Sequence, residues 1–352
     1  MGIKDRILGQ SVNPNGKPHI KSITPAAALA GGEVRIHGSH LASNDLSRPR
    51  VHFGEALANV VISSDELVIA RVPDDATTGE VQVRNGNEHS NTHEVSVGIG
   101  IAENVHPVAN PAVDREGNIF TTVSGSRGQK VPVSVYKIDV EYAVTPFLSD
   151  IMNATGLAFD EHGYLYVSSR YDGTVYRVSA NGTMTTHAES MGVATGLAFG
   201  PDGSLFVGDR SGTIFKVSAQ RDIFVYATLE PSVSAYHLAF GGDGDLYVSG
   251  PTTSSFDAVY RVNDKGEVSD FFRGLGRPQG LAFDLENNLY VAASLKGQRG
   301  IVKITPRGEA SLAVSGHNIV GLAFAPGKAA IIATTSALHY LNWGIEGMPL
   351  FG

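Results

Sequence analysis

The sequence predicts an all-β protein in which a small β-sandwich precedes a six-bladed β-propeller with four antiparallel strands per blade. Three observations predict this. An apolar motif recurs at steps of 40, 41, 43 and 41 residues in the second part of the chain. Most copies are followed by a Gly-containing turn and a strand of alternating polarity. The first hundred residues carry short alternating strands without this repeat. The chain has 352 residues, enough for about two domains.

The N-terminal part divides into an arm and a sandwich. Residues 1–17 contain several Gly and Asn residues and are expected to form a loose arm. Residues 18–97 contain short alternating segments, which are typical of a β-sandwich. These segments include Gly31-Gly-Glu-Val-Arg-Ile-His-Gly-Ser-His-Leu41, Val51-His-Phe-Gly54, Glu66-Leu-Val-Ile-Ala-Arg-Val-Pro73 and Thr78-Gly-Glu-Val-Gln-Val-Arg84.

The recurring motif marks the inner strands of the propeller, which we expect over residues 98–352. Gly-Leu-Ala-Phe occurs four times, His-Leu-Ala-Phe once, and a weaker sixth copy is Asn110-Pro-Ala-Val-Asp114. The small residues of the motif suit the crowded axis of a propeller. The predicted inner strands lie near residues 110–114, 155–160, 195–200, 236–241, 279–284 and 320–325.

The remaining strands of each unit follow from turn chemistry and alternation. Turns such as Pro201-Asp-Gly203 supply the positive φ that hairpins need. The next strand alternates, as in Tyr164-Leu-Tyr-Val-Ser168. A third strand such as Thr174-Val-Tyr-Arg-Val178 and a fourth such as Asp222-Ile-Phe-Val-Tyr226 complete the unit. Four antiparallel strands in a repeating unit predict a propeller rather than a helical solenoid.

A propeller ring must close, because a free edge exposes unpaired backbone groups. Residues 99–103 stand 11 residues before the first inner strand, measured from Ile101 to Ala112, which matches the 10 residues from Phe147 to Leu157. We therefore expect residues 99–103 to form the outermost strand of the last blade. The competing candidate is the C-terminal stretch Met348-Pro-Leu-Phe-Gly352.

Both parts of the chain resemble known families. The repeated Gly-Leu-Ala-Phe-Asp and Leu-Tyr-Val pieces resemble NHL repeats and the propellers of senescence marker protein and gluconolactonase, over roughly residues 105–343. The order of the sandwich strands resembles an IPT/TIG domain, an immunoglobulin-like module. This resemblance implies a binding or spacer role for the module, while propellers host many activities.

The gluconolactonase resemblance implies a divalent metal at the axis, held by carboxylate and amide oxygens at the start of the inner strands. A hard cation requires such oxygen ligands. No carboxylate stands at these positions in this chain, and only Asn110, one place away, is of a ligand type. The residues found there are Ala109, Thr155, Thr195, Tyr236, Gln279 and Val320. We therefore predict no metal site and no cofactor, with a divalent metal expected only if the protein is a lactonase-like hydrolase, and the basis for metal-assisted hydrolysis is lost.

The same positions can form a neutral, hydrogen-bonding axial pocket. Its candidate residues are Asn110, Thr155, Thr195, Tyr236, His237 and Gln279. The alternative, which we favour, is that these side chains cap strand ends and hold channel waters. His237 replaces the Gly of the other repeats and is a candidate general base, although such a histidine more often fills space.

The loops between second and third strands are expected on the same face as the pocket, and several carry cations. They include Arg127, Lys130, Arg170, Arg210, Lys296 and Arg299. Such a ring of charge would attract a carboxylate, a phosphate or an acidic protein surface. The alternative is ordinary solvated loop charge, partly neutralised by Asp172 and Asp209.

Composition excludes several classes of function. The net charge of −8 argues against general nucleic-acid binding. The chain has no cysteine, which excludes disulfides, thiolate metal sites and cysteine nucleophiles. No apolar run reaches the ~18 residues of a membrane span. The N-terminus lacks the apolar stretch of a signal peptide, so the protein is cytoplasmic or its signal was removed.

Two functions from different classes remain. The first is a non-enzymatic recognition or scaffold protein whose propeller face binds a small ligand or a protein partner. The second is a gluconolactonase-like hydrolase, or a lyase, with an altered axial site. The missing carboxylates favour the first function, and the resemblance of the fold favours the second.

Overall fold

The computed structural model describes residues 16–42, 48–123, 125 and 129–349. Every regular element in these ranges is a β-strand, so no described helix is long and apolar enough to cross a membrane. The chain forms two compact units. The first comprises residues 1–98 with 314–316, and the second comprises residues 99–313 with 317–352. The predicted arm lies outside the described residues up to position 15.

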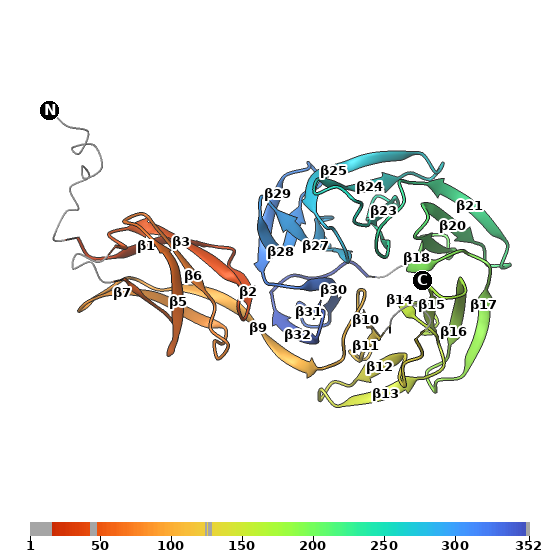
Figure 1. Ribbon diagram of the computed structural model, residues 1–352, viewed down its shortest axis with the longest axis horizontal. Coiled ribbons are helices and arrows are strands. Elements are labelled where there is room, and N and C mark those ends of the chain that lie inside the picture. Colours follow the sequence, from red (N-terminus) through yellow and green to blue (C-terminus); the bar gives the residue numbers. More distant parts are fainter. Residues whose placement is uncertain (1–15, 43–47, 124, 126–128, 350–352) are drawn as a thin grey trace. The chain divides into compact units, whose positions relative to one another are not determined.

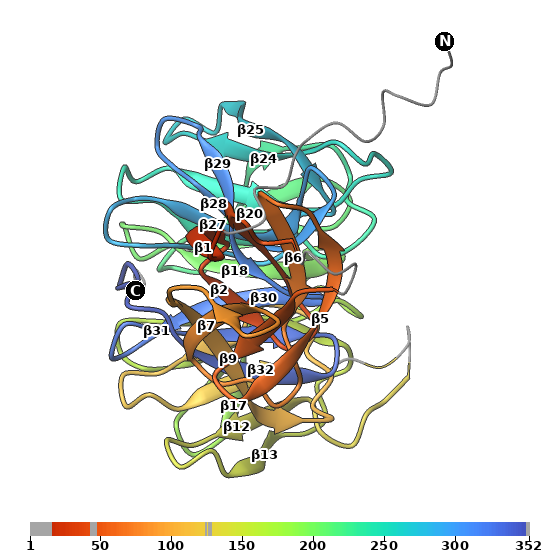
Figure 2. The same ribbon diagram turned by 90° about the vertical axis from the view of Figure 1, so that its left-hand side faces the viewer.

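The first unit is an antiparallel β-sandwich. One group of paired strands runs β1–β3–β6–β5, and a second runs β5–β4–β7–β9, so that β5 joins both. In Figure 2 these strands are drawn in red and orange. The strands are β1 (His19–Thr24), β2 (Ala27–Leu29), β3 (Glu33–Ser39), β4 (Arg50–Phe53), β5 (Ala56–Ser63), β6 (Leu67–Arg71), β7 (Gly79–Asn85), β8 (Glu88–His89) and β9 (His93–Glu103).

Alternation of apolar residues explains the core of this sandwich. Val34 and Ile36 of β3 point inward and are fully buried, while Glu33 before them and Arg35 between them are half-buried. Val81 and Val83 do the same on β7. Because successive side chains of a strand point to opposite faces, this pattern leaves one face of each sheet for the core.

The second unit is built from repeated antiparallel sheets of four consecutive strands. Figure 1 shows these sheets set radially about a common centre, with β10, β14, β18 and β30 innermost. The first three sheets are β10 (Ala112–Val113), β11 (Ile119–Thr122), β12 (Val135–Ile138), β13 (Val144–Leu148); β14 (Ala154–Phe159), β15 (Leu165–Ser169), β16 (Thr174–Val178), β17 (Met184–Ala188); and β18 (Ala194–Phe199), β19 (Leu205–Asp209), β20 (Thr213–Val217), β21 (Ile223–Thr228).

The later strands repeat the same pairing order, which makes this unit propeller-like. They are β22 (His237–Phe240), β23 (Leu246–Ser249), β24 (Asp257–Val262), β25 (Val268–Gly276), β26 (Leu281–Phe283), β27 (Leu289–Leu295), β28 (Gln298–Ile304), β29 (Ala310–Ser315), β30 (Ile319–Ala325), β31 (Ala329–Thr334) and β32 (Ala337–Asn342). Each pairs antiparallel with its neighbour from β22 to β25, from β26 to β28 and from β30 to β32.

The two stretches considered for ring closure pair with different strands. Residues 99–103 of β9 lie antiparallel to β32, with Ile99 opposite Tyr340 and Glu103 opposite Ala337. Near the C-terminus, Gly347 forms a bridge with Asp284 beyond the end of β26. The former stretch therefore extends the sheet of β30–β32, and the latter lies against the end of an inner strand.

The inner strands lie close together, and this explains the repeated Gly of their motif. A Cβ atom added to Gly156 would collide with the backbone oxygen of Thr195, and one added to Gly196 would collide with the backbone oxygen of Tyr236. The turns after the inner strands need glycine for a different reason. Gly203 has a φ of +74°, in the region that L-residues rarely adopt.

Candidate functional site

A cavity of about 880 Å³ lies in the second unit, where the inner strands β10 and β14 end. We call it the turn-side cavity, because its walls are mostly turns. They comprise residues 114–116 after β10, residues 160–163 after β14, the turn at 179–180, residues 324–328 at the end of β30, and the C-terminal segment 346–349. Its volume is within the usual range for small-ligand sites.

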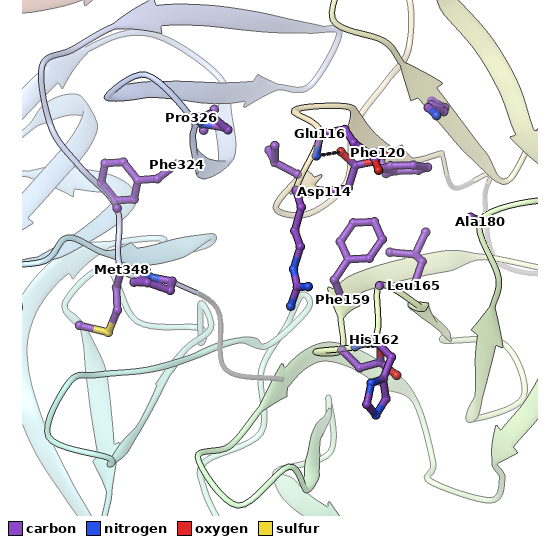
Figure 3. Close-up of a pocket in the computed structure, with 18 of the residues that line it drawn as sticks. Asp114, Glu116, Phe120, Phe159, His162, Leu165, Ala180, Phe324, Pro326 and Met348 are labelled. Atoms are coloured by element: carbon purple, nitrogen blue, oxygen red, sulfur yellow. Dashed lines mark hydrogen bonds between the residues drawn. The ribbon is translucent and has the colours of Figure 1, made fainter.

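Two walls of the turn-side cavity are apolar. On one wall, the ring of Phe120 packs edge-on against Phe147 and Phe159, with centroids 5.0 Å and 5.4 Å away. Figure 3 shows Phe120 and Phe159 across the cavity from Phe324 and Met348. A ligand with a hydrocarbon part would therefore contact apolar side chains on both sides.

The two aspartates of the cavity have internal roles. Asp114 accepts hydrogen bonds from the backbone N–H of Asn118 at 2.8 Å and from its Nδ2 at 2.7 Å. Asp160 accepts from the backbone N–H of Tyr164 at 2.9 Å and from the hydroxyl of Tyr166 at 3.3 Å. Burial, and then the Asp160 charge, raise the pKa of Tyr166 to about 12, so its hydroxyl stays protonated and remains a donor. These carboxylates hold turns together.

The cations of the cavity have fewer partners. Lys137 is half-buried, and its Nζ lies 5.8 Å from the ring centroid of Phe120. Arg115 donates from Nη2 to the backbone oxygen of Glu161 at 2.8 Å, and Lys328 is exposed. Glu346 adds an exposed carboxylate at the C-terminal segment.

The arrangement of these groups suits binding more than nucleophilic chemistry. The lining includes one serine and one histidine, Ser179 and His162. The Ser179 hydroxyl donates to Asn181 Oδ1 at 2.5 Å, and the exposed His162 ring lies 3.7 Å from a Glu161 carboxylate oxygen. The hydroxyl is thus committed to its own turn, whereas an activated nucleophile must be hydrogen-bonded to its base.

A second, smaller cavity of about 130 Å³ lies at the centre of the inner strands. The Leu-Ala-Phe pieces of β14, β18, β22, β26 and β30 line it, together with Asn110 and residues 348–349. Met348 therefore borders both cavities, and its backbone N–H donates to the Phe283 oxygen at 2.9 Å. The apolar lining makes this space a poor site for a polar ligand.

Three residues of the predicted axial pocket donate hydrogen bonds from their hydroxyls to neighbouring backbone oxygens. Thr155 and Thr195 are buried, and their hydroxyls donate to the backbone oxygens of Asn153 at 3.1 Å and Gly208 at 2.9 Å. The Tyr236 hydroxyl donates to the Glu230 backbone oxygen. These contacts are those of side chains that hold strand ends in place.

Asn110 and Gln279 occupy the same end of the inner strands. Asn110 Nδ2 donates to the Leu281 oxygen at 3.0 Å, and its Oδ1 accepts from the Leu322 N–H at 3.1 Å, so it links β26 to β30. The Gln279 backbone N–H donates to the Ala292 oxygen at 2.9 Å. Of the six predicted pocket residues, only Asn110 borders either cavity described above.

His237 is buried at the start of β22, opposite Ser249 on β23. Burial lowers its pKa to about 4, because desolvation penalises the charged imidazolium. Among the described residues, no hydrogen bond to its ring is found. A general base of pKa near 4 without an orienting partner would be a weak catalyst at neutral pH.

The structure brings together two of the predicted basic loop residues. Burial and the nearby charge of Arg210 lower the pKa of Arg170, whose Nη2 donates to the Gly125 oxygen at 3.0 Å. Arg210 Nε donates to the Ser232 oxygen at 3.2 Å. Lys296 is exposed, and Arg127 lies outside the described residues.

The two other cations of these loops are exposed. Lys130 forms an ion pair with Asp150, with Nζ 2.5 Å from Oδ1. Arg299 lies on β28. Among the residues that the structure describes, no group of three or more His, Asp or Glu side chains is placed to hold a metal ion.

Comparison with known proteins identifies the first unit and the fold of the second. Residues 18–97 match the model of the IPT/TIG domain. A structure described as a putative gluconolactonase matches with 17% identity and a TM-score of 0.60, covering 72% of this chain and 94% of that chain. Among curated proteins, none matches the sequence significantly.

Two further solved structures share the fold. An auxiliary nutrient binding protein from Bacteroides thetaiotaomicron has 13% identity and a TM-score of 0.54, covering 93% of this chain and 98% of that chain. Virginiamycin B lyase from Staphylococcus aureus has 17% identity and a TM-score of 0.51, covering 70% and 85%. At these identities, the likeness establishes a propeller-like fold and no activity.

The sequence reasoning missed the turn-side cavity altogether. The candidate pocket residues stand at the start of the inner strands, whereas this cavity lies at their other end. One signal was available: Asn118 stands where the next repeat has Tyr164, and this replacement changes which groups the turn aspartate holds. No sequence pattern predicted that residues 346–349 line the cavity, because this depends on the path of the chain after β32.

Proposed function

We propose that this protein is a non-enzymatic recognition protein, an IPT/TIG module followed by a six-bladed propeller that binds a small ligand in the turn-side cavity. The observation that carries the proposal is the cavity itself. It has about 880 Å³ of space, two apolar walls and three lining cations, Arg115, Lys137 and Lys328, that form no ion pair with any residue the structure describes. Its polar hydroxyl and aspartate groups are committed to turns.

The six-bladed arrangement is supported by the repeat and by strand pairing. The inner-strand motif occurs in six copies, counting the weaker copy at residues 110–114. Residues 99–103 pair with β32 and supply a fourth strand to the sheet of β30–β32. A ring closed by a strand from the start of the unit protects the edge of its last sheet.

A role in binding small molecules agrees with one protein of similar fold. That protein is described as an auxiliary nutrient binding protein and matches over nearly its whole length. The proposal requires no cofactor. The proposed ligand site lies at the opposite end of the inner strands from the candidate axial pocket, where the hydroxyls of Thr155, Thr195 and Tyr236 bond to backbone, as the favoured alternative of strand-end caps expects.

The alternative function is a hydrolase or lyase with an altered axial site. It is favoured only by the fold, which this protein shares with a putative gluconolactonase and with virginiamycin B lyase. Stoichiometric divalent metal in the purified protein would favour the alternative, because hydrolysis by this route needs an activated water.

A cavity-filling variant tests the proposal. Ala180 is exposed in the turn at 179–180 and lines the cavity, so Ala180→Trp should fill part of it without disturbing the core. Fragments that show saturation-transfer NMR signals with the wild-type protein are expected to lose most of that signal with this variant. Ala219→Trp is the matched control, because Ala219 is exposed at the same turn position one repeat later and does not line this cavity.

The control decides between specific and general effects. If both variants retain every fragment signal, the turn-side cavity is not the ligand site. If both lose the signal equally, binding depends on some other property of the protein, and the proposal also fails. Thermal melts of the two variants check that each remains folded.

A further inference from the structure

The third strand of the repeated sheets carries a cation at an equivalent position. This position follows an aromatic or β-branched residue and precedes a buried Val or Ile. The members are Lys137, Arg177, Lys216, Arg261 and Lys303. Because the third strand is paired with the second, these cations lie near the aspartate of the turn after the inner strand.

In three repeats an aspartate of that turn pairs with the cation; it is the first residue of the turn at Asp160 and the third at Asp202 and Asp243. Arg177 Nε lies 3.8 Å from Asp160 Oδ2, and Lys216 Nζ lies 2.6 Å from Asp202 Oδ2. Arg261 Nη2 lies 3.1 Å from Asp243 Oδ2, and its Nε lies 2.5 Å from Asp245 Oδ2. The pairing of turn aspartate and third-strand cation is thus a regular feature of the fold.

In the first repeat the aspartate is occupied by another side chain. Asp114 Oδ1 accepts from the backbone N–H groups of Glu116 at 3.0 Å and Asn118 at 2.8 Å. Its Oδ2 accepts from Asn118 Nδ2 at 2.7 Å. Within the described residues, Lys137 forms no ion pair. Its ammonium group lies over the face of Phe120 instead.

The fifth repeat has the same asparagine and, in the part that the structure describes, the same lack of an ion pair. There Asn288 Nδ2 donates to Asp284 Oδ2 at 2.8 Å, and Lys303 has no ion pair among the described residues. Lys303 lies 5.8 Å from the ring centroid of Tyr290, just as Lys137 lies over Phe120. Only Lys137 of these two lines the turn-side cavity.

Lys303 shows that the fold tolerates a half-buried lysine over an aromatic ring without a carboxylate partner, whereas Lys137 in addition lines a ligand-sized cavity, where a ligand carboxylate can reach it. Arg115 and Lys328 add positive charge to the same lining. The lining also holds four carboxylates. Those of Glu116 and Glu346 are exposed, as are Arg115 and Lys328, whereas the half-buried carboxylates of Asp114 and Asp160 accept hydrogen bonds within their own repeats. Solvent screens exposed charges more than half-buried ones.

The apolar walls specify the rest of the ligand. Phe159 stands on the same side of the cavity as Phe120, while Phe324 and Met348 stand across from it (Figure 3). A group held at Lys137 would extend its hydrocarbon part between these walls. A purely ionic ligand would leave the walls uncovered, and a neutral ligand would leave Lys137 unpaired.

We propose that the turn-side cavity binds an amphipathic organic acid, with its carboxylate paired to Lys137 and its hydrocarbon part between Phe159 and the side chains of Phe324 and Met348. This inference rests on the proposed function and adds the chemical class of its ligand. The interaction is a charge-assisted hydrogen bond together with apolar burial.

Three probes of one shape and different charge test this inference. They are 4-phenylbutyrate, 4-phenylbutan-1-ol and 4-phenylbutylamine, measured by calorimetric titration at low salt. The acid is expected to bind the wild-type protein at least about tenfold more tightly than the alcohol or the amine, which is the usual effect of one charge-assisted hydrogen bond.

Variants at Lys137 identify the residue responsible. K137Q is expected to weaken binding of the acid by about tenfold or more and to leave binding of the alcohol unchanged. K137R keeps the charge and should retain binding of the acid. K303Q is the matched control, because Lys303 is also unpaired at the equivalent strand position but lies outside the cavity.

The outcomes separate this inference from the proposed function. If the alcohol or the amine binds as tightly as the acid and A180W abolishes binding, the cavity is a ligand site and the inference is wrong. Equal loss of acid binding in K137Q and K303Q would also overturn it. If none of the three probes binds the wild-type protein, the proposed function and the inference fall together.

Discussion

At the residue scale, the turn aspartates and the tyrosines of the second strands form a repeated contact. The hydroxyls of Tyr247 and Tyr290 donate to Asp243 and Asp284 at 2.9 Å and 3.0 Å. Burial is the main cause that raises the pKa of Tyr290, and the Asp284 charge adds to it. The tyrosine of the Leu-Tyr-Val piece therefore fills the core with its ring and fastens the turn with its hydroxyl.

His237 should make stability depend on pH in a definite direction. Its folded pKa, about 4, lies below the ~6.5 of an unfolded histidine. The unfolded chain therefore takes up a proton first as pH falls, and stability is lost between about pH 6.5 and 4. From pH 7 to 4.5 this loss should be about 2 kcal/mol.

Urea unfolding at these two pH values measures the effect. His237→Gln should reduce the loss of stability by about 2 kcal/mol relative to the wild-type protein. His317→Gln, at an exposed position, is the control and should leave the loss unchanged. An identical pH dependence in the wild-type protein and His237→Gln would show that the imidazole is not buried in its neutral form.

At the scale of the element, the inner strands are held by aromatic contacts between neighbouring sheets. Phe199 at the end of β18 packs edge-on against Tyr166 of β15, with centroids 4.9 Å apart. Phe240 at the end of β22 makes the same contact with Phe206 of β19, also at 4.9 Å. The last residue of the Leu-Ala-Phe motif thus joins each sheet to the next.

Phe199→Ala should destabilise the protein by about 3–5 kcal/mol, because it removes a buried ring and leaves a cavity between two sheets. Phe199 is 8% exposed, whereas Phe224 on the outer strand β21 is 55% exposed. Phe224→Ala is therefore the control, with an expected loss below about 1 kcal/mol. A similarly small loss for Phe199→Ala in a denaturant titration would contradict the buried position of the inner strand.

The alternation of apolar side chains and the repeated motif predicted the strands, because each strand pairs with a neighbour that is close in sequence and because the same pairing recurs in each repeat. The all-β class follows from alternation, and the turns follow from residues such as Gly203, whose φ is positive as expected. The IPT/TIG module was predicted from strand order and is confirmed by the family match over residues 18–97. The candidate site did not follow in this way.

The turn-side cavity could not be predicted from the sequence for two physical reasons. The cavity depends on contacts between strands far apart in sequence, such as β10, β14 and β30, and on the return of residues 346–349 to the end of β26. In addition, the sequence does not tell whether polar residues near a propeller axis line a pocket or form hydrogen bonds with neighbouring backbone. Thr155 and Thr195 are examples.

At the scale of the whole molecule, the two ends of the inner strands differ in character. At the start of the strands, Thr155, Thr195 and Asn110 are bound to neighbouring backbone. At the other end, the turns enclose a cavity with apolar walls and with cations that form no ion pair inside the described ranges. The start of the strands therefore has a structural role, and the turns at their ends form the proposed recognition site.

The most direct test of this assignment is to locate a bound ligand by NMR with methyl-labelled methionine and threonine. The account predicts nuclear Overhauser contacts between the ring protons of bound 4-phenylbutyrate and the methyl group of Met348. It predicts no such contacts to the methyl groups of Thr155 and Thr195. Contacts to these two threonines, with none to Met348, would place the ligand at the start of the inner strands and contradict the account.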